Sequence, residues 1–321
     1  MAADYIINVL DQTWYMNANQ TFESKLMGFD HIDFIQSAVD GVLFGSTYAL
    51  IGLGFTLIFG AMQKLNMAYA AASLGGAYVG LAGITILGLP ALWAFVIGPV
   101  ASGMLGLLVY VACFQYMPRG NHLAPLMASI GALFFIDEVI IHATAGSPLS
   151  FPAVLPQAYF LLGDFGIRGD LLFAMFISFV LMAAILFLLY RTKLGLATRA
   201  ASQQPVASLL CGIPTRKTNA TTFVLAGVLG GIAGCLVASS VGVLSPLLAL
   251  PLTIKGLIAT VIGGLGSIRG AIIAGFLIGA FENLFLLMRG VNERDIYVFM
   301  LLFLFLLFRP NGLFGAAINR D

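Results

Sequence analysis

Residues 171–217 read LLFAMFISFVLMAAILFLLYRTKLGLATRAASQQPVASLLCGIPTRK and join an apolar run to a polar island. The first twenty residues carry no charge, whereas the island at residues 191–217 holds five basic residues and no acidic one. About twenty apolar residues in a helix are long enough to cross the hydrocarbon core of a bilayer. This stretch therefore predicts a membrane span followed by a segment in water.

The rest of the chain repeats the apolar pattern. Of its 321 residues, 60% are hydrophobic and 9% are charged, whereas a soluble domain carries about 25% charged residues. The composition predicts an all-α, polytopic transmembrane helical bundle with about eight to nine membrane segments. The net charge of +1 and the lack of a basic cluster interleaved with aromatics give no reason to expect nucleic-acid binding. We expect spans near 37–62, 67–88, 91–116, 124–143, 172–190 and 219–241, a glycine-broken pair near 252–265 and 269–288, and a last span near 295–308.

Three regions follow from this pattern. Residues 1–34 form an N-terminal extension, for which a helix on the membrane surface and a frayed terminus are both open. Residues 35–315 form the transmembrane domain, and residues 316–321 form a short tail. Within residues 191–217, we expect a short helix from Thr198 to Leu210, with Pro205 interrupting it or setting its first turn.

Basic residues in short loops indicate the orientation, because they are enriched on the cytoplasmic side. With the island in the cytoplasm, Lys64, Arg119 and Arg309 also fall on that side. The acidic N-terminus and the loop at 144–171 fall outside, with only Lys25 and Arg168 as basic residues. The N-terminus is therefore predicted to be periplasmic and the C-terminus cytoplasmic.

No motif for enzymatic chemistry is visible. The sequence contains no GxxxxGK[ST] phosphate-binding loop, no HExxH and no GxSxG. We therefore expect a transport protein rather than an enzyme. The cysteines Cys113, Cys211 and Cys235 lack metal-site spacing, and we expect buried structural thiols and no metal site.

Two features are candidates for a transport pathway. The stretch IGGLGSIRG at residues 262–270 breaks an apolar run with glycines. It either lines a watery cavity, as broken helices in transporters do, or forms a tight turn between two spans. The second feature is the set of polar residues within spans, which are costly in lipid and usually face the bundle interior or water. They are Asp137, Glu138, Glu282 and Asn283, of which Glu282 lies deepest within a span.

Close pairs of glycines predict how the spans pack. Many of the 37 glycines recur at four-residue spacing, for example Gly41 with Gly45 and Gly275 with Gly279. Small residues at this spacing let helix backbones approach closely in a membrane. We therefore expect a tight bundle.

The island resembles the coupling loop of ABC importer permeases, with Gly195 and Arg199 at its start, Ala207 eight residues after Arg199, and Gly212 at its end. More specifically, the chain resembles the LivH-type permeases of branched-chain amino-acid importers. Over residues 37–315, the matching stretches are GVLFGSTYALIGLGFTLIFGAMQKLNMAYA (41–70), VIGGLGSIRGAIIAGFLIGAFENL (261–284) and LLFRPNGLFG (306–315).

The resemblance implies a subunit of the bacterial inner membrane that binds no cofactor itself. It implies four kinds of contact: a second homologous permease, two ATP-binding subunits that dock on the coupling loops, a periplasmic substrate-binding protein, and membrane lipid. The four island residues just named would couple ATP hydrolysis in the partners to transport.

The sequence indicates an importer permease more clearly than it indicates the transported substrate. Members of the family often carry a His-Gly-Glu run where this chain has Tyr69-Ala70-Ala71 after Asn66-Met67-Ala68. Urea, short amides and aromatic acids, which relatives carry, therefore stay open beside branched-chain amino acids. Two other classes also stay open: a stand-alone proton-coupled transporter using Asp137, Glu138 or Glu282, and a monosaccharide-importer permease. We predict that the substrate path contacts Asn66, Tyr69, Gly263, Gly264, Ser267 and Glu282.

Overall fold

The computed structural model describes residues 31–117, 123–154, 159–162, 165–290, 294–310 and 312–315. Within these ranges, eight helical segments are long and apolar enough to cross a membrane, and a shorter apolar helix, α12, follows them. The predicted helical bundle is confirmed, and the span limits agree to within six residues. The helices are α2 (His31–Met62), α3 (Tyr69–Leu87), α4 (Ala94–Tyr110), α5 (Leu123–Thr144), α6 (Gly169–Arg191), α9 (Thr215–Val241), α10 (Ala249–Gly263), α11 (Ile268–Arg289) and α12 (Arg294–Phe308).

Three short helical turns extend or precede these spans. The 3₁₀ turn η1 (Ala91–Trp93) leads into α4, and the π-helical turn η2 (Val111–Gln115) continues it. A further 3₁₀ turn, η3 (Pro246–Leu248), leads into α10. Because of these turns, the third and seventh spans reach membrane-spanning length although α4 and α10 alone are short.

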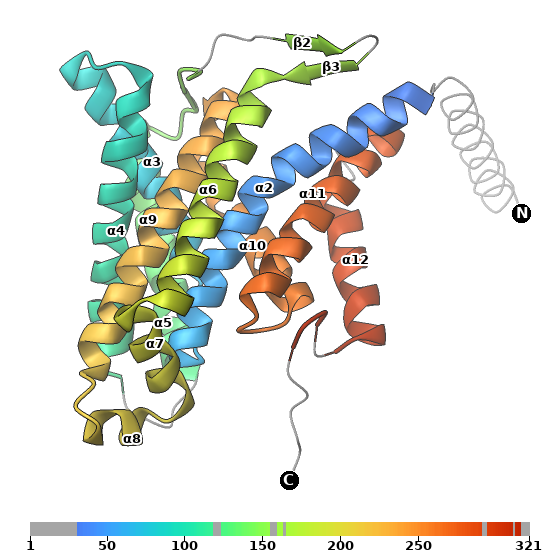
Figure 1. Ribbon diagram of the computed structural model, residues 1–321. Helices are drawn as coiled ribbons and strands as arrows, with labels where there is room; N and C mark the ends of the chain where they lie inside the picture. Colours follow the sequence, from blue (N-terminus) through green and yellow to red (C-terminus); the bar gives the residue numbers. More distant parts are fainter. Residues whose placement is uncertain are drawn as a thin grey trace, which may run out of the picture.

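Helix α2 runs through the centre of the molecule (Figure 1). It packs against α11 and α10 on one side and against α9 and α6 on the other. Helices α3, α4 and α9 pack tightly on one another, while α5 contacts mainly α3 and η2. Helix α5 is accordingly the least buried of the eight candidate spans.

Short strands lie at one end of the bundle, opposite the island helices α7 (Lys193–Gln203) and α8 (Pro205–Leu210) (Figure 1). Strands β2 (Tyr159–Leu162) and β3 (Phe165–Arg168) form an antiparallel hairpin. Strand β1 (Leu149–Ser150) pairs with β4 (Val243–Leu244), which ties the segment after α5 to the segment after α9.

Glycine decides where the backbones meet, as the sequence predicted. A Cβ atom on Gly41 would lie 2.7 Å from the carbonyl oxygen of Gly279, and one on Gly45 would lie 3.0 Å from that of Gly275. Helices α2 and α11 therefore touch backbone to backbone. The same close approach joins α4 to α3 and α9, at Gly76, Gly98, Gly103, Gly227 and Gly231.

Candidate functional site

A buried cluster of charges joins three helices. The Lys255 ammonium, on α10, lies 2.6 Å from Oε1 of Glu282 on α11 and 3.1 Å from Oδ1 of Asp295 on α12. The Lys255 side chain is 10% exposed and that of Glu282 only 2%. A charged group buried this far from solvent requires an opposite charge within hydrogen-bond distance. The three side chains therefore hold α10, α11 and α12 together.

Helix α2 completes the surroundings of this cluster. The Lys255 ammonium lies 5.6 Å from the ring centroid of Tyr48, within the range of a cation–π interaction. Nearby, the Ser37 hydroxyl donates to the carbonyl of Asn283, and the Asn283 amide donates to the carbonyl of Ser37. Four helices thus meet around one cation.

Sequence reasoning placed Glu282 correctly inside a span but missed Lys255. The signal was available, because PLTIKGLIATVIG at residues 251–263 contains a single charge in an otherwise apolar helix. Asp295, the first residue of the predicted last span at 295–308, was missed as well. A role for Glu282 in contacting the substrate stays a prediction.

The other predicted path residues lie in packed surroundings. The Asn66 side-chain oxygen accepts a hydrogen bond from the Ala68 amide, just before α3 begins. Tyr69 is fully buried, with its ring 4.8 Å from that of Phe55. Its hydroxyl would lie 2.9 Å from a Cβ at Gly230, so it fills space that this glycine leaves. Their contact with a substrate stays a prediction.

The glycine break forms a tight turn between α10 and α11, at the same end of the bundle as the island (Figure 1). Gly264 has φ of +100°, a conformation that only glycine adopts readily. The Ser267 hydroxyl caps α11 by accepting a hydrogen bond from the Gly270 amide at 3.3 Å. This geometry favours the turn over a cavity-lining break.

The C-terminal segment closes over this turn. The amide of Leu313 donates to the carbonyl of Ile262 at 2.8 Å, and the amide of Phe314 donates to that of Gly263 at 3.1 Å. A Cβ on Gly264 would lie 2.8 Å from the Cα of Gly315. Two of the stretches that carry the family resemblance, residues 261–284 and 306–315, therefore meet in space.

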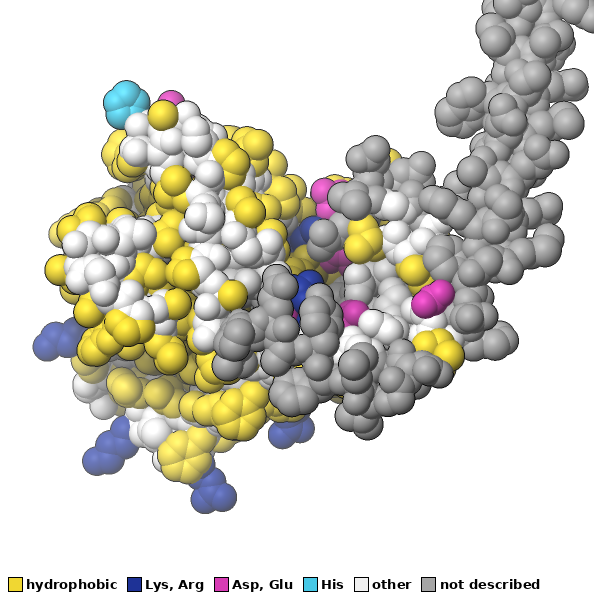
Figure 2. Space-filling model, turned by 90° about the horizontal axis from the view of Figure 1, so that it is seen from above, with side chains coloured by type: hydrophobic (Ala, Val, Ile, Leu, Met, Phe, Trp, Pro, Cys, Tyr) yellow, Lys and Arg dark blue, Asp and Glu magenta, His cyan; other side chains and the backbone are white. Residues whose placement is uncertain are grey.

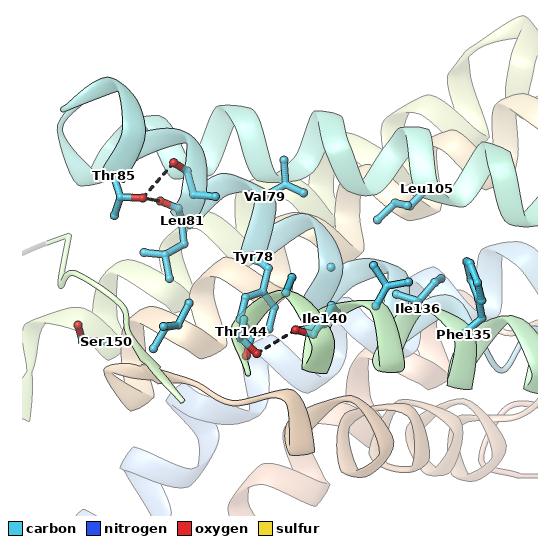
Figure 3. Close-up of a pocket in the computed structure, with 15 residues that line it drawn as sticks. Tyr78, Val79, Leu81, Thr85, Leu105, Phe135, Ile136, Ile140, Thr144 and Ser150 are labelled. Carbon is cyan, nitrogen blue, oxygen red and sulfur yellow. Dashed lines mark hydrogen bonds between the residues drawn. The ribbon is translucent and has the colours of Figure 1, made fainter. Parts of the chain in front are cut away.

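An apolar cavity of about 620 Å³ lies between α3, α4 and α5 (Figure 3). Three of its hydroxyl groups donate to backbone carbonyls: Thr85 to Leu81, Thr144 to Ile140 and Tyr78 to Leu244. Apart from Ser150 at one edge, the remaining walls are aliphatic and aromatic. Such a cavity accepts an aliphatic group rather than a charged one.

Helix α5 also carries two carboxylates. Asp137 is half-buried and Glu138 is exposed, on a helix of 22 residues that begins at Leu123. A carboxylate facing lipid is costly. A proton-coupling role for these two carboxylates stays a prediction.

The view from the strand end shows the overall distribution of charge (Figure 2). Hydrophobic side chains cover most of the described surface, and acidic and basic side chains meet near the middle of this face. Exposed basic residues lie at the opposite end: Arg191, Lys193, Arg199, Arg216 and Lys217 in and beside α7 and α8, and Arg309 after α12.

The island forms two helices rather than one. Helix α7 is capped by the Thr192 hydroxyl, which accepts a hydrogen bond from the amide of Gly195. Pro205 is the first residue of α8, where its missing amide hydrogen costs nothing, so it sets the first turn of a separate helix. Gly212 has φ of +80° and ends the pair.

The predicted coupling residues lie at defined places on this pair. Gly195 is buried against the backbone of Leu189, and any larger side chain would force α7 away from α6. Arg199 is exposed, with its guanidinium 5.4 Å from the ring centroid of Tyr190. Ala207 and Gly212 are exposed on and after α8. The four residues do not form one cluster.

Large apolar side chains are exposed on α8. Leu210 is 86% exposed and Val206 is 68% exposed, although this end of the molecule is rich in basic residues. Exposed apolar groups within a polar surface mark a contact site. Cys211, next to Leu210, is also exposed, so the expected buried thiol is wrong for this cysteine, while Cys113 and Cys235 are buried.

Residues 37–308 match the family described as the branched-chain amino acid transport system / permease component. The chain is 30% identical over 295 residues to the permease protein BraD of the high-affinity branched-chain amino acid transport system of Pseudomonas aeruginosa, covering 88% of this chain and 96% of BraD. It is 28% identical over 299 residues to LivH of Escherichia coli, covering 88% and 96%. It is also 25% identical over 303 residues to LivM of the same organism, covering 87% and 70%. The chain belongs to the family of permease components of branched-chain amino acid transport systems.

Proposed function

We propose that this protein is one of two homologous permease subunits of an ABC importer in a bacterial inner membrane, and that the importer carries branched-chain amino acids into the cytoplasm. The observation that carries the proposal is the family match over residues 37–308. The relatives LivH and LivM, from one organism, are both named as permease proteins of a high-affinity branched-chain amino acid system. Their likeness to this chain supports a pore built from two related subunits.

The island at residues 191–217 supports the proposal that ATP-binding partner subunits drive transport. Helices α7 and α8 project at one end of the bundle and present apolar side chains among basic ones. One of the two ATP-binding subunits would cover these helices, and closure of the two on ATP would move α7 through its short connection to α6. Gly195 would transmit that movement, because it holds α7 directly against Leu189.

The basic end containing α7 and α8 is proposed to be cytoplasmic. Lys64, Arg199, Arg216 and Arg309 lie in or beside the connections at this end, as the positive-inside rule requires of a cytoplasmic face. A substrate-binding protein would then deliver the substrate to the strand end. Of the predicted extension at residues 1–34, only residues 31–34 are among the described residues. Arg119 lies outside the described residues.

The chemistry of the interior supports an amino acid as the substrate. Lys255 and Glu282 pair with each other at 2.6 Å, and a zwitterion would bind here by replacing that contact with its own carboxylate and ammonium groups. The apolar cavity between α3, α4 and α5 suits an aliphatic group, but no residue of α10, α11 or α12 lines it, so it is separate from this pair. A neutral sugar would use neither feature.

Reconstitution tests the proposal. The chain is purified with its second permease and its ATP-binding subunits, placed in liposomes, and supplied with the binding protein and labelled leucine. We expect uptake that requires ATP and survives collapse of the proton gradient. Uptake by this chain alone, driven by a proton gradient, would instead establish the secondary-transporter alternative. Competition by unlabelled isoleucine and valine, but not by urea or ribose, is expected to identify the substrate class.

A further inference from the structure

A second cavity, of about 690 Å³, lies between the bundle and the island. Its walls come from the end of α2, the turn η2, both island helices and the first turns of α9. Unlike the cavity beside α5, it is lined by polar and apolar groups together. It separates the coupling helices from the spans that they are proposed to move.

The charge of this cavity has one sign. Lys64 and Arg216 line it, and its described lining contains no aspartate or glutamate. Neither cation forms an ion pair with another described residue. Burial lowers the pKa of Lys64 from its ordinary value, whereas a neighbouring anion would raise it. The cavity is thus lined by two cations, the partly buried Lys64 and the exposed Arg216, with no described acidic side chain beside them.

The start of α9 adds to this imbalance. No side chain caps the helix after Pro214, and its first turn contains Arg216 and Lys217 but no acidic residue. Because the first turn of a helix favours negative charge, this turn carries the unfavourable sign. An anion in the cavity would pair with the cations and with the free amides of the first turn.

We propose that this cavity binds a phosphate group, held by the Lys64 and Arg216 side chains, with the side-chain amide groups of Gln63 and Asn219 as further donors. The phosphate belongs either to an anionic lipid of the cytoplasmic leaflet or to a soluble phosphate compound. The choice of leaflet rests on the proposed orientation. Basic pockets between spans on the cytoplasmic side are typical binding sites for anionic lipid headgroups.

The bound phosphate would join the island to the bundle. At present few polar contacts cross the cavity: the Gln63 amide donates to the carbonyl of Ser202 at 3.5 Å, and the Tyr110 hydroxyl donates to that of Arg216 at 3.2 Å. Gln63 holds φ of +53°, which is unusual for a residue other than glycine. A ligand that bridges Lys64 and Arg216 would fix the end of α2 to the start of α9, beneath α7 and α8.

Native mass spectrometry of the purified full-length chain tests the site. The chain in detergent is titrated with phosphatidylglycerol or phosphatidylcholine, and the first bound lipid is quantified. We expect preference for phosphatidylglycerol and a loss of affinity of about fivefold for Lys64→Gln or Arg216→Gln, since each cation in contact with an anionic headgroup contributes about that factor. The controls are Lys193→Gln and Arg309→Gln, which remove exposed cations outside the cavity and are expected to keep the wild-type affinity.

A second arm separates the two sources of phosphate. Inorganic phosphate is titrated against the chain in phosphatidylcholine nanodiscs, with thermal stability as the readout. Stabilisation that Lys64→Gln abolishes would identify a soluble phosphate compound, whereas no effect of phosphate together with selective lipid binding would identify the lipid. The proposal is overturned if neither ligand binds, or if the cavity and control variants lose the same affinity. ATP-driven uptake measured on the same variants tests the transport function separately, because lipid binding can fail while uptake persists.

Discussion

Replacing Lys255 by methionine is the sharpest test of the buried charge cluster. The substitution keeps most of the side-chain volume but leaves the Glu282 carboxylate, only 2% exposed, without its cation. Removing one partner of a buried ion pair costs about 3–5 kcal/mol, because the other charge stays desolvated. Asp295 contributes little to this cost, since it is 59% exposed. We therefore expect Lys255→Met to destabilise the fold by about 3–5 kcal/mol.

The double variant Lys255→Met with Glu282→Leu separates pairing from burial. Replacing both members of a buried pair by apolar groups of similar size is often neutral or stabilising. We expect the double variant to recover most of the stability that the single variant loses. The matched control is Asp170→Asn, which breaks the more exposed pair with Arg168 and should cost about 0–1 kcal/mol.

Thermal unfolding in detergent, followed by tryptophan fluorescence and circular dichroism, measures these differences. With about 2–4 °C per kcal/mol for a large domain, the single variant should unfold roughly 6–20 °C below the wild type. A Tm within 1 °C of the wild type, or a double variant less stable than the single one, would refute the reasoning. Uptake by the double variant then tests Glu282 further: a stable protein without uptake would support a substrate contact.

Three further substitutions test the packing and the coupling. Gly279→Val is expected to cost about 1–3 kcal/mol or more, because its Cβ would collide with the α2 backbone, whereas Gly131→Ala, which faces open space, should leave thermal stability unchanged. Gly264→Leu should cost about 1–3 kcal/mol through its positive φ and lower uptake; full uptake would show that the turn tolerates a side chain. Arg199→Glu should reduce co-purification of the ATP-binding subunits while leaving membrane insertion intact, and unchanged recruitment would exclude Arg199 from the docking surface.

Much of the fold follows from features that act locally along the chain. Span positions could be predicted because an apolar run long enough to cross a bilayer has few alternatives to a helix. Gly41, Gly45, Gly275 and Gly279 could be predicted as packing positions because four-residue spacing places small residues on one helix face. Pro205 was predicted either to interrupt one island helix or to set its first turn. In the structure it is the first residue of a separate helix, α8.

The site could be predicted only in part. Glu282 stood out because a carboxylate is rare in an apolar run, yet its partner Lys255 lies 27 residues away, and no spacing rule connects them. Gly264 was read as a break, but the segment that packs on it comes from the C-terminal end, at Leu313–Gly315. Such partners are chosen by how the helices pack, not by local pattern.

By itself, the sequence determined that this protein is a helical membrane bundle of the permease type with a basic island between two spans. Hydrophobic length and charge placement act segment by segment, so they can be read before any segment meets another. The tertiary structure alone decided that Lys255, Glu282 and Asp295 share one buried cluster and that Lys64 and Arg216 face one cavity. Both results depend on which helices pack against one another, and that choice is set by contacts between segments far apart in the chain.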